Sequence, residues 1–289
     1  MTKPKKSRYL ALSLWQYLTT PKSIFLLLAA AAMNMTYLSR FRNILMDGKA
    51  ISILTPFLLL LCSPQIFPSP HFFMSAFVFF LLSQYPRTDG GFMYQMIRTR
   101  RTRWILSEIL QIICVSLIAM LVLFLASILV MIPHVSLSLS WDQELPVWQE
   151  LLIGSWKGTI PYAVIDQLSQ LQALAYALGL WWLYCIFGGL FLLVIRLFVP
   201  RQRNIGLGML FCLYFFDYIC EYCLPYAARY ASPVALSRIS YLDWGFDPIY
   251  PSASYAVAFL LMGCFALCTL SILLAKRTDL DALSARTYK

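Results

Sequence analysis

The segment 104–132 constrains this chain more than any other, because its 29 residues contain a single charged side chain, Glu108. Apolar residues are spread along the whole segment, so it has no polar face to present to water. The composition points the same way: 60% of the 289 residues are hydrophobic and 12% are charged, against roughly 25% charged in soluble domains. These features exclude a soluble domain and predict a protein whose main solvent is lipid.

Other apolar runs are also long enough, or nearly so, to cross a hydrocarbon core of about 30 Å. They predict an all-α, polytopic membrane protein that forms a single transmembrane domain over 1–289, with about six spans. We expect the spans at about 24–39, 67–85, 104–132, 172–198, 206–226 and 253–275. The remaining apolar segment, 51–66, is predicted to dip into the membrane from the outer side. Irregular backbone at that depth requires protein to cover it.

The distribution of Lys and Arg predicts the orientation. The formal net charge is +10, and cytoplasmic loops of membrane proteins are enriched in basic residues. With both termini inside, 17 of the 23 Lys and Arg residues fall on the cytoplasmic side. The basic excess therefore indicates the orientation of the chain in the membrane. We expect no nucleic-acid partner.

A helix lying on the inner leaflet is predicted over 7–20. Leu10, Leu14, Tyr17 and Leu18 recur at helical spacing just after a basic start, a pattern typical of interfacial helices. The alternative is a frayed basic leader that happens to carry leucines. Within span 172–198, three glycines (Gly179, Gly188 and Gly189) are expected to let neighbouring helices approach closely.

Motifs for catalysis and for cofactor binding are missing from the sequence. It has no G-x-x-x-x-G-K-[ST] phosphate loop for ATP and no G-x-S-x-G nucleophile elbow. The two histidines, His71 and His134, have no metal-ligand spacing, and the single C-x-x-C pair, Cys220 and Cys223, lies in an apolar run. We therefore expect no enzyme activity, no metal and no cofactor in this chain, and a membrane-embedded enzyme is the weakest functional class.

The segment 83–110 is the most informative part of the chain. A span ends, a short Gly-containing polar piece follows, and an Arg-dense stretch leads directly into the next span. The pattern is a Gly-Phe pair, a short hydrophobic turn, several basic residues and an aromatic residue. Its residues are Gly91, Phe92, the turn 93–97, Arg98, Arg100, Arg101, Arg103 and Trp104. This pattern resembles the loop between spans two and three in the permease subunits of export-type (type-2) ABC transporters of Gram-positive bacteria. The family often has Lys or Gln where this chain has Glu108.

The resemblance covers the layout of the whole chain and implies a multi-pass export protein of the bacterial plasma membrane. It implies two partners besides lipid: a cytoplasmic ABC ATPase that binds the ATP, and a second permease subunit, identical or related. The segment 89–103 would form a cytoplasmic coupling helix that contacts the ATPase, with Gly91, Phe92, Arg98, Arg100, Arg101 and Arg103 as coupling residues. The alternative is that these arginines only keep the loop on the cytoplasmic side.

Two carboxylates inside the fifth predicted span suggest a substrate path. Asp217 and Glu221 are four residues apart and share a helix face with Tyr214 and Tyr218 nearby. This face would favour a cationic amphiphile, such as a basic peptide or drug. Alternatively, the carboxylates are hydrogen-bonded by tyrosines or paired with an arginine. A second functional class uses the same residues: an ion-gradient-driven secondary transporter or channel coupled through Asp217 and Glu221.

Overall fold

The computed structural model describes ten parts of the chain: residues 15–44, 50–62, 69–85, 101–132, 134–142, 145, 160–199, 205–223, 225–245 and 250–277. Four of its helices are long and apolar enough to cross a membrane: α2 (Pro21–Ile44), α6 (Arg101–Met131), α9 (Gln170–Phe198) and α12 (Ala253–Arg277). The chain is thus a mostly helical, multi-pass membrane protein.

Shorter elements complete the described part of the fold. Two of them are apolar helices, α4 (Pro70–Leu82) and α10 (Ile205–Tyr222). The others are β1 (Ile51–Ser52), α3 (Thr55–Leu61), β2 (Val135–Ser136), α8 (Tyr162–Gln167), the 3-10 helix η2 (Tyr226–Ala231), α11 (Pro233–Leu236) and the 3-10 helix η3 (Ile239–Tyr241).

Each predicted span coincides with a helix, and local sequence explains where the shorter ones begin and end. α4 begins where Ser69 caps the helix, its hydroxyl accepting from the N–H of Phe72, and Pro70 occupies the first helical position. α10 ends at Tyr222, earlier than the predicted 226, because Pro225 cannot continue a helix. At 1.5 Å per residue, the 13 residues of α4 reach about 20 Å and the 18 residues of α10 about 27 Å.

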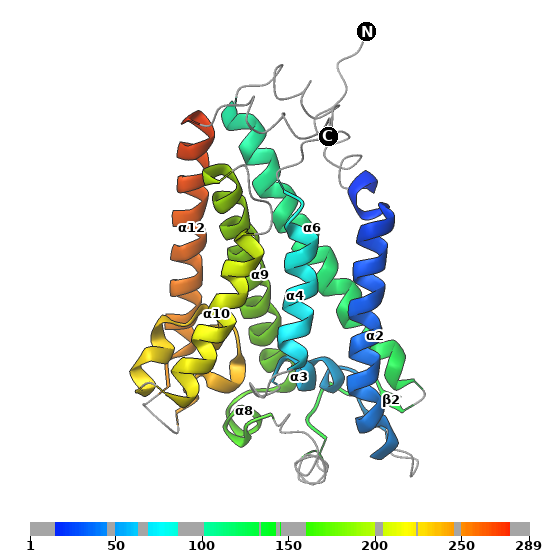
Figure 1. The fold of residues 1–289 in the computed structure, drawn as a ribbon. Coiled ribbons are helices and arrows are strands. Elements are labelled where there is room, and N and C mark those ends of the chain that lie inside the picture. Colours follow the sequence, from blue (N-terminus) through cyan, green and yellow to red (C-terminus); the bar gives the residue numbers. More distant parts are fainter. Residues whose placement is uncertain are drawn as a thin grey trace.

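The long helices run along one axis of the molecule (Figure 1). α12 packs along α9, and α2 packs along both α6 and α4. The start of α2, the start of α6 and the end of α12 lie at the same end of the bundle, whereas α3 and α8 lie at the other (Figure 1). We call the first the basic end, because Arg101, Arg103 and Arg196 lie there, and the second the loop end.

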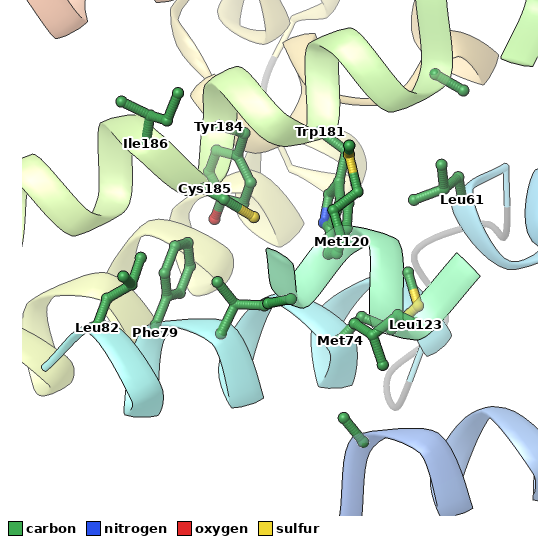
Figure 2. Packing of buried hydrophobic residues seen from close by; sticks show 14 of the residues in the cluster. Leu61, Met74, Phe79, Leu82, Met120, Leu123, Trp181, Tyr184, Cys185 and Ile186 are labelled. Atoms are coloured by element: carbon green, nitrogen blue, oxygen red, sulfur yellow. The ribbon is translucent and has the colours of Figure 1, made fainter. Parts of the chain in front are cut away.

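Helix α9 is the packing centre. Its Trp181 donates a hydrogen bond to Ser75 of α4 at 3.0 Å, and Trp182 donates to Ser116 of α6 at 3.1 Å. Figure 2 shows Phe79 of α4 pointing toward Tyr184 of α9, and their ring centroids are 5.4 Å apart. These contacts hold α9 between two neighbours.

The glycines of α9 behave differently from one another. A Cβ added at Gly188 would lie 2.2 Å from the Phe79 ring, and one at Gly189 would lie 2.6 Å from Ile112 of α6. At Gly179 nothing lies within 4 Å. The prediction of close helix approach is therefore confirmed for Gly188 and Gly189 and is wrong for Gly179.

The segment predicted to dip into the membrane forms β1 and the short helix α3, at the loop end. Every residue of α3 is buried, and β1 pairs in parallel with β2, so that Ile51 faces Val135. The protein thus covers this segment as far as Cys62, and residues 63–66 lie outside the described part.

A buried polar network joins the loops at the loop end. The Ser52 hydroxyl donates to the side-chain oxygen of Gln170 at 2.7 Å, and the Gln170 amide donates to the Thr55 hydroxyl at 2.8 Å. Asp142 accepts from the Ser52 backbone N–H at 3.1 Å and from the Thr55 hydroxyl at 3.2 Å. Burial raises the pKa of the Asp142 carboxyl, and the hydrogen bonds from Ser52 and Thr55 oppose that rise.

We expect Gly188→Ala to destabilise the protein and Gly179→Ala to leave it unchanged or stabilise it. Overpacking against the enclosed Phe79 ring costs about 1–3 kcal/mol, whereas alanine in open helical space gains up to about 1 kcal/mol. Thermal unfolding of both variants in detergent measures the difference. Equal melting temperatures would contradict the close α9–α4 contact.

We expect Gln170→Leu to lower stability by about 1–3 kcal/mol, because two buried hydrogen bonds to the Gln170 amide are lost, while Ser52 keeps the Ser138 carbonyl and Thr55 keeps Asp142 as partners. Ser254→Ala is the matched control: Ser254 is exposed and bonds only the hydroxyl of Ser252 among the described residues. The control should shift stability by less than about 0.5 kcal/mol. Chemical denaturation of the two variants side by side measures the free energy of unfolding. An unchanged value for Gln170→Leu would refute the role of the network.

Candidate functional site

The predicted coupling residues lie partly within the described chain. Gly91, Phe92, Arg98 and Arg100 fall outside the described residues, as does most of the predicted coupling helix 89–103. Arg101 and Arg103 form the first turn of α6. The Arg101 guanidinium donates to the backbone carbonyl of Lys276 at 3.0 Å, and Arg103 is exposed. We call Arg98 to Arg103 the basic segment. Its described end, Arg101 to Arg103, is the first turn of α6, and Arg101 also touches the last turn of α12.

The end of α4 gathers a second set of contacts at the basic end. Tyr17 is buried, its hydroxyl donates to the carbonyl of Leu81, and its ring lies 5.1 Å from that of Tyr85. Arg196 of α9 donates to the carbonyls of Ser83 and Tyr85 at 3.3 and 3.2 Å. These carbonyls lie just past the C-terminus of α4, where a cation is favourable.

Of the predicted interfacial helix 7–20, the structure describes residues 15–20. Trp15–Leu18 form one helical turn, with Trp15 69% exposed. Tyr17 and Leu18 pack against the apolar core. The last turn of the leader is thus docked on the protein, and 7–14 lie outside the described residues.

A cavity of about 440 Å³ lies between α4 and α10, and its walls are mainly aromatic. Its volume falls within the usual range for small-ligand pockets. The lining residues are Ser69, Phe72, Phe211, Tyr214, Phe215, Tyr218 and Arg238.

Helical spacing on α10 builds one wall of this pocket. Phe211, Tyr214, Phe215 and Tyr218 follow an i, i+3, i+4, i+7 pattern, so their side chains share one face. Opposite them, the ring of Phe72 lies 4.8 Å from that of Tyr214, in an edge-to-face contact. Phe215 is 66% exposed and Tyr218 44% exposed. The pocket therefore opens sideways along the outer face of α10, which is apolar.

Arg238 supplies the charge of the pocket. The residue lies between α11 and η3, where its N–H bonds the carbonyl of Ala235 at 3.1 Å and its own carbonyl accepts from Tyr241 at 3.2 Å. The side chain is 1% exposed, and its guanidinium carbon lies 5.6 Å from the centroid of the Tyr241 ring. Within the part of the chain that the structure describes, none of the three guanidinium nitrogens has a hydrogen-bond partner.

A histidine packs behind the pocket wall. His71, in the first turn of α4, is fully buried, with Nε2 3.2 Å from the Ser237 hydroxyl and Nδ1 3.4 Å from the Tyr214 hydroxyl. Its ring stacks on that of Tyr184 at 6.0 Å. These contacts fix Tyr214 and the segment that carries Arg238 against α4 and α9.

The structure places the residues of the predicted substrate path in different surroundings. Tyr214 and Tyr218 line the pocket. Asp217 is 2% exposed and accepts a hydrogen bond from the Ser232 hydroxyl, so its carboxylate is held inside the protein. The side chain of Glu221 lies outside the described part. The charged residue on the pocket wall is Arg238, which is not among the site residues predicted from the sequence.

Sequence reasoning had a usable signal for Arg238. It stands in a run, Ser232 to Leu242, that carries no other charge and is mostly apolar. An arginine in such surroundings is a candidate for burial, and a buried charge is a candidate for function.

No set of three metal-ligating side chains occurs among the described residues. All eight cysteines lie in the described part and are free thiols, and of the C-x-x-C pair Cys220 is buried while Cys223 is exposed.

Comparisons with family models, with curated proteins and with solved structures give no match to this chain.

Proposed function

We propose that this chain is the membrane-spanning subunit of an ATP-driven ABC exporter, working with a separate cytoplasmic ATPase and a second permease subunit. Its substrate would be a peptide, a drug or a lipid-like amphiphile. The observation that carries the proposal is the basic segment that ends in the first turn of α6. There Arg103 is exposed, and Arg101 bonds the last turn of α12.

The proposal requires six spans with both termini in the cytoplasm of a bacterial cell. The four long helices supply four of them. α4 and α10 supply the others, since a short apolar helix is accommodated by local thinning of the bilayer or by flanking residues that reach the interface. In this arrangement the basic end faces the cytoplasm, in agreement with the enrichment of Lys and Arg there.

The contacts at the basic end suit a coupling role. An ATPase that closes on ATP must move a rigid part of its partner, and rigid-body shifts of helices transmit such motion. A push on the segment before α6 would act on α6 through the chain and on α12 through the Arg101–Lys276 bond. The docked turn at Tyr17 would extend the same surface to α4.

We expect charge reversal of the basic segment, Arg98→Glu with Arg100→Glu and Arg103→Glu, to weaken association with an ABC ATPase encoded beside this chain. Each exposed ion pair contributes up to about 1 kcal/mol, so the triple variant should lose at least tenfold in co-purification and in ATP-driven export.

Lys22→Glu is the matched control, because Lys22 is an exposed cation at the start of α2, at the same end but outside the basic segment and its contacts. It should retain both activities. No association of the wild-type chain with the ATPase, or equal losses in both variants, would refute the coupling role.

A secondary transporter or channel is the second candidate, and Asp217 favours it: a carboxylate buried in a membrane helix is costly and often functional. In this case proton-driven uptake by ATP-free vesicles should occur, and Asp217→Asn should abolish it. Ser232→Ala, which removes the hydroxyl that bonds Asp217 but keeps the carboxylate, should alter its pH dependence without abolishing transport. Uptake that requires ATP and survives Asp217→Asn would exclude this candidate.

A further inference from the structure

Arg238 has no counter-charge in the described structure. A buried guanidinium without an ionic partner costs several kcal/mol, and the usual remedy is a carboxylate or phosphate that forms paired hydrogen bonds with it. Arg238 acts electrostatically on His71 and Tyr214, and its guanidinium lies over the uncharged ring of Tyr241. All three of its side-chain nitrogens remain available to an incoming acceptor within the described part of the molecule.

The position of Arg238 makes it available to a ligand. Although the side chain is 1% exposed, it forms part of the wall of the 440 Å³ pocket. Ser69, which is the N-cap residue of α4, lies on the same wall. Its oxygen accepts from Phe72, and its hydroxyl proton is not used by any described residue. The N-terminal end of α4 also favours negative charge.

The rest of the pocket has the opposite character. Phe72, Phe211 and Phe215 contribute rings, Tyr214 and Tyr218 contribute further aromatic area, and the cavity opens along the exposed side of α10. In a membrane protein such a lateral opening faces hydrocarbon. A small hydrated anion would leave the aromatic walls uncovered, and a cationic amphiphile would be repelled by Arg238.

We infer that this pocket binds an anionic amphiphile, with its carboxylate or phosphate group at Arg238 and Ser69 and its hydrocarbon chain along the aromatic side chains of α10. Entry is from the bilayer. The claim that this amphiphile is the exported cargo rests on the proposed function. The claim that it binds at Arg238 does not. The inference also assigns a different charge preference from the cationic one suggested by Asp217 and Glu221 in the sequence.

Binding to the full-length chain in dodecyl maltoside tests the inference. The probes are dodecyl phosphate, dodecyltrimethylammonium and inorganic phosphate, followed by calorimetry and thermal unfolding. Dodecyl phosphate should bind and raise the melting temperature, since a ligand that binds only the folded state stabilises it. The cationic probe and inorganic phosphate should do neither. A shift of equal size with the cationic probe would overturn the inference, and one with inorganic phosphate would reassign the site to a free anion.

Arg238→Met should weaken dodecyl phosphate binding at least tenfold. It should also raise the melting temperature of the ligand-free protein, because it removes an unpaired buried charge. Unchanged binding in this variant would overturn the inference. Arg238→Lys keeps the charge without the planar fork and should bind with intermediate affinity.

A matched pair on α10 gives an answer that does not depend on folding of the arginine variants. Phe215 is 66% exposed and lines the pocket, whereas its neighbour Phe216 is 38% exposed and does not. Phe215→Ala should weaken dodecyl phosphate binding severalfold and Phe216→Ala should leave it unchanged. Equal affinities would refute the pocket as the site of binding.

Failure of this inference and failure of the proposed function are distinguishable. If dodecyl phosphate does not bind, or if the cationic probe binds equally well, the inference about the pocket at the loop end fails. Neither result affects ATPase association at Arg103. A chain that binds dodecyl phosphate through Arg238 but no ATPase would retain the pocket and refute the exporter.

Discussion

The seating of α9 between α4 and α6 is the constraint on which the rest of the structure depends. In lipid there is little hydrophobic force between helices, so association relies on close packing and hydrogen bonds. α9 uses both: Gly188 and Gly189 let Phe79 and Ile112 approach its backbone, and Trp181 and Trp182 each bond a serine of a neighbouring helix. α12 then packs along the remaining side of α9.

The position of the pocket follows from this arrangement. Because α4 is fixed on α9, its first turn places His71 against Tyr184 and within reach of Tyr214 and Ser237. These contacts join four segments: the start of α4, the middle of α9, the middle of α10 and the turn after α11. The aromatic face of α10 and the guanidinium of Arg238 are thereby brought to one cavity.

Arginines occupy three different environments in the described part of this molecule. Arg196 and Arg101 donate to carbonyls at or just past the ends of α4 and α12, which suits the negative end of the helix dipole. Arg103 is exposed. Arg238 is buried on a pocket wall without an anionic partner among the described residues. All four contribute equally to the net charge, yet their surroundings differ.

Sequence by itself determined the solvent of this protein and the positions of its helices. Apolar runs such as 104–132 dictate a membrane environment, and Ser69, Pro70 and Pro225 mark helix ends through local backbone chemistry. It also placed Tyr214 and Tyr218 on one helix face, because side chains four residues apart share a face, and both line the pocket.

Only the tertiary structure decided which glycines are packed against a neighbour, that Asp217 bonds Ser232, and that Arg238 lines the pocket. Gly179 and Gly188 are the same residue in the same helix, and the difference between them is the Phe79 ring from α4. Such outcomes depend on which helix lies opposite, and that is set by long-range packing rather than by spacing along the chain.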